Sequence, residues 1–532
     1  MTRSRRYLIR AGVLMGLAPL LVYVGPRSFL AHDEGYYALQ ARWIQLSGQW
    51  LAPLWWDQPL YDRTIGVQWL IAGSEQLLGS GAWAAHLPSI LAACASLVFT
   101  AQLGRQLLGF GMGWLSALLL ALTPLWLNYA HQASQDMPLL ALELLGLLAL
   151  LRCTPGKADP WPWLAGLWLG PAVLMKGFMV AVPVVAMLPL ALMRRRHLLV
   201  DGRFWAGLAL GAMPVALWLH LSIQQFGPGV VGGLVDKLLY LSKSDTYSEG
   251  PFYYFWNIPA NAAPWSLAAL VGLAVGWRHW RGEQQLVLVT YPCTLLLLLS
   301  VFRTKTPYYG LQLTPFLALW AAFALKEWVA SGPCRPRWPA WAAAVIGGVL
   351  LIAGSLVLRP SLGLENTLAP LPSATVAVAA WSVGTSWLLL PQQHRSSRAF
   401  MAVLLGPWLA MVLLVQSGLF TDRSPLQRRA LESAALQGAL SQGPVAVVAP
   451  APLDGDAHSQ LILVALGTPH LGPMLRSLND VPPGRWAWIQ EQELSRIQSS
   501  EPITTLAKGS DLAPWTLVRR GHRFSDEQRV SP

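Results

Sequence analysis

The apolar stretch Tyr7–Val24, YLIRAGVLMGLAPLLVYV, is followed after a few residues by His32-Asp33-Glu34-Gly35-Tyr36-Tyr37. The first segment is long enough to cross a bilayer, and basic residues precede it. An acidic side chain costs roughly 2.5 kcal/mol or more at a bilayer centre, so acids beside a membrane face water, the protein interior or a functional site. Asp33 and Glu34 therefore stand where a transmembrane helix emerges on the non-cytoplasmic side.

The composition is that of a polytopic membrane protein. Of 532 residues, 54% are hydrophobic and 12% charged, with 27 Trp and a mean hydropathy of +0.42. The net charge of +12 comes from short basic clusters between apolar runs, which is the positive-inside pattern of membrane topology. Nucleic-acid binding is not expected, because no basic surface with interleaved aromatic residues is recognisable. The four cysteines lack metal-ligand spacing, and a disulfide framework is not expected.

Hydropathy predicts about 13 spans, with the N-terminus inside and the C-terminus outside. A basic start and an apolar run are also typical of a cleaved signal peptide, but no small-residue cleavage site precedes Pro26, so we expect a retained helix. The long outer loops are expected at about 25–83 and 223–261, the first with interfacial helices at 36–46 and 65–78. The spans after Tyr7–Val24 are expected at 84–104, 111–127, 136–152, 161–175, 177–193, 204–222, 262–277, 285–302, 309–328, 339–357, 373–391 and 399–418.

The chain divides into a membrane domain, residues 1–419, and a polar segment, residues 420–532. Strand-like runs at 444–448, 460–466 and 486–489, with helix-prone stretches between them, predict a small α/β soluble domain on the outer face. No motif in this domain carries chemistry.

Acids and bases from five separate outer segments are expected to meet at one membrane face. Each has an ordinary structural interpretation, because a boundary Lys or Arg often anchors a span and an Asp at a helix start often caps it. Together they suit an active site for an anionic lipid-linked substrate, with bases on phosphate oxygens and a carboxylate as general base. The set includes Asp33, Glu34, Asp62 and Arg63 of the first outer loop, Asp136, Lys176, then Lys243, Asp245 and Glu249 of the second outer loop, and Arg303, Lys305 and the tyrosines Tyr308 and Tyr309.

Six segments resemble, in order, those of the bacterial dolichyl-phosphate-mannose-type transferases and the lipid A aminoarabinose transferases. That group has the membrane-embedded C-type glycosyltransferase fold. The resemblance covers about residues 7–330 by motif. The segments are His32–Arg42, Tyr61–Gly66 with Trp69, Gln135–Met137, Leu174–Met179, Pro251–Tyr254 with Pro264-Trp265, and Lys305–Tyr309.

The resemblance implies an inverting transfer of a sugar from a polyprenyl phosphate, outside the cytoplasm. Asp33 would be the general base, with Asp136 and Glu34 as the other catalytic carboxylates; Asp136 would orient the acceptor or the base. The lipid phosphate departs as an anion and needs only charge stabilisation. The candidate phosphate ligands are Arg63, which stands where the family usually has Lys, together with Lys176, Lys305 and Tyr309.

Neither a cofactor nor a metal site is expected, although a divalent metal stays open and His32 is a conceivable ligand. The donor is expected to be an undecaprenyl-phosphate sugar, and the acceptor a lipid, a protein or a glycan. The expected location is the bacterial inner membrane, with the active site and C-terminal domain on the periplasmic side. The alternative is a transporter or flippase of a lipid-linked sugar, but no internal repeat supports it. A third hypothesis is a membrane scaffold whose C-terminal domain is the working part. Nothing in residues 420–532 supports it beyond the presence of that domain.

Overall fold

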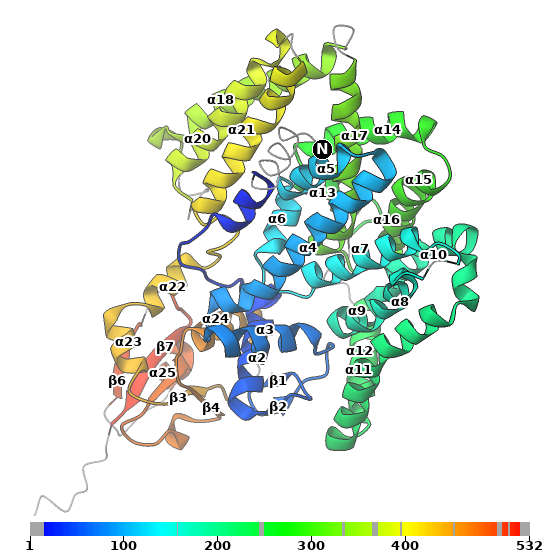
Figure 1. Cartoon of the computed structure of the whole chain (residues 1–532). Coiled ribbons are helices and arrows are strands. Elements are labelled where there is room, and N and C mark those ends of the chain that lie inside the picture. Colours follow the sequence, from blue (N-terminus) through cyan, green and yellow to red (C-terminus); the bar gives the residue numbers. More distant parts are fainter. Residues whose placement is uncertain are drawn as a thin grey trace, which may run out of the picture.

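The structure, a computed structural model, describes residues 15–156, 158–243, 249–331, 336–363, 371–393, 396–450, 453–496, 503–508 and 511–521. Long helices pack into a bundle, and a small sheet domain lies beyond one end of it (Figure 1). Among the described residues eight helices are long and apolar enough to cross a membrane, or up to ten if each bent pair is one span. The eight are Ala82–Leu108, Trp161–Arg194, Gly202–Phe226, Glu283–Val301, Pro307–Ala330, Trp338–Val357, Ser373–Gln392 and Ser397–Gln416.

The sequence predicts about 13 spans, whereas length and composition of the described helices give eight to ten. The bent pairs are α5 with α6, at 72°, and α13 with α14, at 118°. Helix α7, Asp136–Arg152, has the predicted bounds but only 17 residues. The first predicted span, 7–24, lies partly outside the described residues, which are helical from 15 to 21. The bent helices are α5 (Met112–Ala121), α6 (Pro124–Ala130), α13 (Tyr253–Asn261) and α14 (Trp265–His279).

The apolar stretch Trp161–Arg194 doubles back at its middle. The Trp161 ring lies 4.5 Å from the guanidinium of Arg152, at the end of α7, and Arg195 donates to the Leu150 carbonyl at 2.8 Å. Both ends of the stretch are thus at one end of α7. Lys176, midway, pairs with Asp136 at the other end. The predicted spans 161–175 and 177–193, which count as a single apolar stretch by length and composition, are thus the two arms of a hairpin that turns at Lys176-Gly177. Its parts are α8 (Trp161–Leu167), α9 (Leu169–Lys176), η2 (Gly177–Val180) and α10 (Ala181–Arg194).

The first arm of this hairpin packs tightly on α11, Gly202–Phe226. A Cβ on Gly170 would lie 1.7 Å from the carbonyl oxygen of Gly211, so only glycine permits this approach. Small residues at helix crossings are how membrane helices gain packing contact. The contact holds α9, and with it Lys176, against α11.

The first outer loop forms the two predicted helices. Helix α2 spans Tyr36–Ser47 and α3 spans Gly66–Leu78, joined by the hairpin β1 (Leu54–Trp55) and β2 (Gln58–Pro59). A π-helical turn, η1 (Ala31–Gly35), precedes α2 and carries Asp33. In the second outer loop, α12 spans Gly229–Lys243 and α13 follows the gap in the described residues.

The C-terminal domain is a five-stranded mixed sheet with the order β4-β3-β5-β7-β6. The central strands β3 and β5 are parallel, whereas β5, β7 and β6 are antiparallel neighbours. The strands predicted at 444–448 and 486–489 are confirmed. The strands are β3 (Val445–Val448), β4 (Leu471–Leu475), β5 (Trp486–Gln490), β6 (Ile503–Leu506) and β7 (Trp515–Arg520), with helices α22 (Pro425–Leu431), α23 (Ala434–Leu440), α24 (Gly455–Leu466) and α25 (Glu491–Arg496).

The strand predicted at 460–466 is wrong, because this segment is the second half of α24. Short apolar runs fit a buried helix as well as a strand. The side chain of Asp454 accepts from the Ala457 backbone N–H at 2.7 Å and so starts a helix. That helix presents its apolar residues to both the sheet and the first outer loop.

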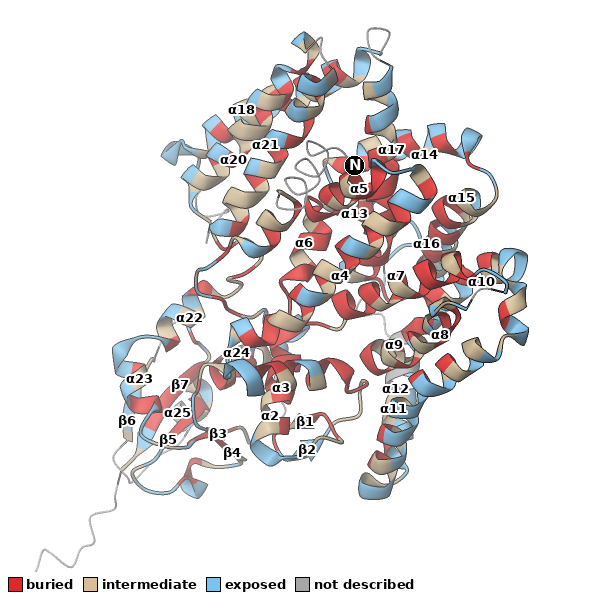
Figure 2. Cartoon of the chain, viewed as in Figure 1, coloured by how far each residue is buried: buried red, intermediate tan, exposed pale blue. Residues whose placement is uncertain are grey.

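Helix α24 docks the C-terminal domain onto the first outer loop. Arg42 of α2 donates to the carbonyls of Ala465 and Leu466, at the end of α24, and to those of Thr468 and Pro469 just beyond it. Buried side chains from both parts form one apolar cluster, and the ribbon of these elements is largely coloured as buried in Figure 2. A Cβ on Gly35 would lie 2.9 Å from the Ile462 side chain, so η1 and α24 touch directly. The domain and the loop therefore share one end of the bundle.

Candidate active site

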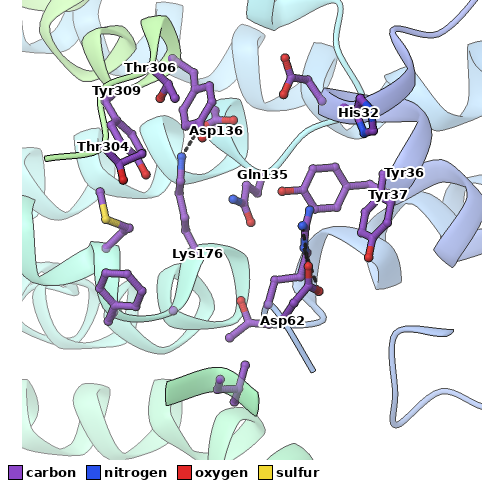
Figure 3. A pocket seen from close by; sticks show the side chains of 18 of the residues that line it. His32, Tyr36, Tyr37, Asp62, Gln135, Asp136, Lys176, Thr304, Thr306 and Tyr309 are labelled. Carbon is purple, nitrogen blue, oxygen red and sulfur yellow. Dashed lines mark hydrogen bonds and ion pairs between the residues drawn. The ribbon is translucent and has the colours of Figure 1, made fainter. Parts of the chain in front are cut away.

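A cavity of about 1130 Å³ opens where the bundle, the first outer loop and the C-terminal domain meet. Figure 3 shows its polar side chains: His32, Tyr36 and Tyr37 line one side, and Lys176, Thr304 and Tyr309 the other. The remaining wall is apolar and comes from α9, α11 and α12 with the turn η2. Its residues are Val173, Phe178, Met179, Val215, Trp218, Leu219, Leu234 and Val235.

Asp33 lies on the cavity wall in η1, and its side chain is exposed. Partial desolvation raises the pKa of this carboxyl above its usual range, and the negative charge of Asp136 raises it further. A carboxylate with a raised pKa is a stronger base than an ordinary aspartate. The position predicted for Asp33 is therefore one from which it can act on a bound molecule.

Glu34, its neighbour, points the other way and is fully buried. Its carboxylate accepts from the backbone N–H of Leu30 at 2.6 Å and of Ala133 at 3.0 Å, and it lies 3.0 Å from His86 Nε2. Burial opposes ionisation, but His86, Arg423 and the Leu30 amide outweigh it and lower the pKa of Glu34. Glu34 does not line the cavity, so the predicted catalytic role for it is not supported, and a positioning role fits instead.

Asp136 and Lys176 form an ion pair on the cavity wall, drawn as a dashed line in Figure 3. Asp136 is the first residue of α7 and Lys176 the last of α9, so the hairpin geometry brings them together. The ammonium of Lys176 also lies 4.5 Å from the ring centre of Tyr308 and 4.9 Å from that of Tyr309. Cations are attracted to such ring faces.

Arg63 is held by an acid and two rings. Its Nε and Nη2 donate to the two carboxylate oxygens of Asp62, at 3.1 and 2.7 Å. Its guanidinium carbon lies 4.5 Å from the ring centre of Tyr36 and 4.8 Å from that of Tyr37. Arg63 therefore lies beside the helix that follows Asp33.

Lys305 lines the cavity, but its ammonium donates to the carbonyl oxygens of Ser300, at 3.0 Å, and Phe302. Desolvation lowers the pKa of Lys305. The neighbouring backbone is fixed by Tyr254 of α13, whose hydroxyl donates to the Thr306 carbonyl at 3.2 Å. The Pro251–Tyr254 segment is one of the six that resemble family segments. In the structure its Tyr254 holds the loop that carries Lys305.

Sequence reasoning missed His458, which reaches the cavity from α24. Its ring stacks on His32 at 5.2 Å between ring centres and lies 4.8 Å from the ring of Trp55. Nε2 of His32 lies 2.6 Å from the hydroxyl of Ser459, on the same helix. Only the docking of α24 on η1 unites these residues, so no local sequence signal marks His458.

Arg423, in the linker that leads from α21 (Ser396–Gln416) to the C-terminal domain, was also missed. It donates to Asn128 and lies close enough to Asp33 and Glu34 to favour their charged forms. In the part of the chain that the structure describes, no group of three His, Cys, Asp or Glu side chains has metal-ligand geometry.

Part of the chain matches a family model, and several known proteins are similar to it in sequence. Residues 62–220 match the family model described as dolichyl-phosphate-mannose-protein mannosyltransferase. Three similar proteins are undecaprenyl phosphate-alpha-4-amino-4-deoxy-L-arabinose arabinosyl transferases. That of Pseudomonas fluorescens is 26% identical over 61% of this chain and 60% of its own length, and that of Sodalis glossinidius 29% over 59% of each. That of Erwinia tasmaniensis is 27% identical over 66% of each. The chain thus spans about three fifths to two thirds of these relatives.

Solved structures show the same fold. ArnT from Cupriavidus metallidurans, crystallised with undecaprenyl phosphate, superposes with a TM-score of 0.75 at 17% identity, covering 96% of this chain and 97% of that one. The oligosaccharyltransferase of Archaeoglobus fulgidus gives a TM-score of 0.51 at 11% identity, covering 89% and 64%. The chain thus resembles the dolichyl-phosphate-mannose-protein mannosyltransferase model over residues 62–220, is similar in sequence to aminoarabinose transferases, and has the fold of ArnT.

Proposed function

We propose that the protein is an integral-membrane glycosyltransferase that moves a sugar from a polyprenyl-phosphate donor to an acceptor, with inversion. The observation that carries this proposal is the cavity itself, which unites an exposed carboxylate, several cations and an apolar wall. The carboxylate suits an acceptor hydroxyl, the cations suit a phosphate, and the apolar wall suits a prenyl chain. The related transferases are named for the same class of donor.

In the proposed reaction, Asp33 takes the proton of the acceptor hydroxyl as its oxygen attacks the anomeric carbon. The bond between that carbon and the phosphate oxygen breaks, and its electron pair leaves with the polyprenyl phosphate. Lys176, Arg63 and Tyr309 stabilise the charge of this leaving group. Attack and departure on opposite faces of the sugar give inversion. The separation in Figure 3 of His32, next to Asp33, from Lys176 and Tyr309 supports this arrangement.

We place the cavity on the periplasmic side of a bacterial inner membrane. Arg194, Arg195 and Arg203 lie at the opposite end of the bundle from the Asp136–Lys176 pair, as the hydrogen bond of Arg195 to Leu150 supports. Basic residues favour the cytoplasmic side. Residues 1–419 would then form the catalytic membrane domain and residues 420–532 a periplasmic domain, which adds His458 to the site.

A release assay tests the proposal. Purified protein is incubated with a panel of undecaprenyl-phosphate sugars and membrane extract, and liberated undecaprenyl phosphate is measured. We expect release from one donor, and its loss in Asp33→Asn, which removes the base without changing shape. The matched control is Asp57→Asn, an exposed aspartate of the same loop outside the cavity. Wild-type turnover by Asp33→Asn would refute the assignment of Asp33 as the base. If the protein binds a donor without consuming it, and flips that donor across the bilayer of liposomes, a transporter would be favoured.

A further inference from the structure

The cations proposed to bind phosphate already have partners within the protein. Lys176 pairs with Asp136, Arg63 is bound through two nitrogens by Asp62, and Lys305 donates to two backbone carbonyls. A phosphate that enters this cavity therefore exchanges one set of partners for another. The pair on Lys176 matters most, because its acid is itself a proposed site residue.

The Asp136–Lys176 pair is nearly enclosed. The side chains of Lys176 and Asp136 are 7% and 10% exposed, and the rings of Tyr308 and Tyr309 cover the ammonium. Interactions between charges are strong where water is largely excluded. A phosphate on Lys176 would bring a second negative charge against Asp136, in a place where little solvent screens the repulsion. Phosphate and Asp136 therefore compete for one ammonium.

Asp136 has a second charged neighbour on the side of the cavity where the acceptor is proposed to bind. It is close enough to Asp33 to raise the pKa of that carboxyl, and both line the same cavity as Gln132 and Gln135. A carboxylate released from Lys176 would thus remain within the polar part of the cavity. There it can accept a hydrogen bond from a hydroxyl, which a carboxylate held by Lys176 does less readily.

We propose that the donor phosphate displaces Asp136 from Lys176, and that the released carboxylate then orients the acceptor for Asp33. This inference rests on the proposed function and adds an order to it, with the donor first and the acceptor second. Asp136 is then a positioning residue that weakens donor binding while it supports transfer. The two effects have opposite signs, which a purely structural ion pair does not produce.

Binding of undecaprenyl phosphate to the full-length protein in detergent tests the exchange without knowledge of the acceptor. Asp136→Asn removes the competing charge, so we expect the lipid to bind at least threefold more tightly than to the wild type. Lys176→Gln should bind it at least threefold more weakly. In the release assay, Asp136→Asn should nevertheless lose at least tenfold in donor consumption. Equal or weaker lipid binding by Asp136→Asn would overturn the inference.

Two further variants guard against trivial outcomes. Asp136→Ser also removes the charge and places a residue tolerated at helix starts, so it serves if Asp136→Asn folds poorly. Asp57→Asn removes one negative charge outside the cavity and should leave lipid affinity unchanged. A wild type that fails to bind undecaprenyl phosphate would contradict the proposed function itself. A wild type that binds it, with no gain in either Asp136 variant, would contradict only the exchange.

Discussion

Replacing Glu34 by alanine should detach the turn that carries Asp33 from the bundle. Glu34 is fully buried and joins three partners: the N–H groups of Leu30 and Ala133 and the ring of His86. Leu30 precedes η1, whereas Ala133 lies three residues before Asp136. One carboxylate therefore fixes the loop of Asp33 relative to the loop of Asp136.

The size of the effect follows from these contacts. A hydrogen bond to a charged group contributes about 1.5–3 kcal/mol, and removing one partner of a buried charged pair costs about 3–5 kcal/mol. We take about 3–5 kcal/mol for Glu34→Ala, because the part-buried amide of Leu30, the buried amide of Ala133 and the ring of His86 lose their common partner together. Since about 1.4 kcal/mol is a factor of ten, local opening should become roughly 10² to 4 × 10³ times more frequent. Glu34→Gln keeps the shape and one acceptor oxygen. Its frequency of local opening should therefore lie between those of the wild type and Glu34→Ala.

Hydrogen exchange with mass spectrometry measures this opening. Peptides that contain Leu30 and Ala133 should exchange faster in Glu34→Ala, whereas peptides of the C-terminal sheet should not. Asp57→Ala, which removes an exposed acid of the first outer loop outside the cavity, is the control. Unchanged protection at both amides would refute the positioning role. Because the folded pKa of Glu34 is lowered, its contribution is present above the unfolded value and is lost as pH falls through the folded value.

Three other predictions concern the rest of the site. Desolvation and the charge of Asp136 raise the pKa of Asp33, and a general base must be ionised to act. Donor consumption should therefore fall at low pH, with a midpoint above the ordinary aspartate pKa of about 3.9. A midpoint at or below that value would contradict the prediction. Arg42→Ala removes the donors to four carbonyls at the end of α24, so trypsin should release the C-terminal domain several times faster; equal rates would count against the clamp. His458→Ala should raise the half-saturating amount of acceptor extract several-fold without changing donor saturation, whereas the exposed His470→Ala should change neither.

The ordered motifs were sufficient to predict which residues meet in the cavity. Asp33, Asp136, Lys176 and Arg63 all line it, although they come from separate segments of the chain. Motif order carries this information because each segment stands at the end of a span or in an outer loop, and spans bring those ends to one face. Tyr309 also lines the cavity, with its ring centre 4.9 Å from the ammonium of Lys176, and its role at the phosphate stays a prediction.

Sequence could not separate the roles of Asp33 and Glu34. The two carboxylates are adjacent and chemically alike, and only the π-helical turn directs one outward and the other into the protein. Nor could it find His458, whose position depends on a docking surface made by distant residues. Nor could it show that the ammonium of Lys305, whose role at a phosphate stays a prediction, donates to the carbonyls of Ser300 and Phe302 at the end of α16, Tyr291–Val301.

The docking of α24 on η1 has a consequence for the life of the chain. Residues 455–466 are synthesised after α21, and through His458 they form part of the wall of a cavity whose other lining residues lie between His32 and Tyr309. A nascent chain that has inserted all its spans still lacks this wall, and so do products truncated after α21. For the proposed transferase, such a dependence on a late-made segment would delay activity until the C-terminal domain has been synthesised and has docked. It also means that the membrane part, expressed alone, should not be taken as a minimal enzyme.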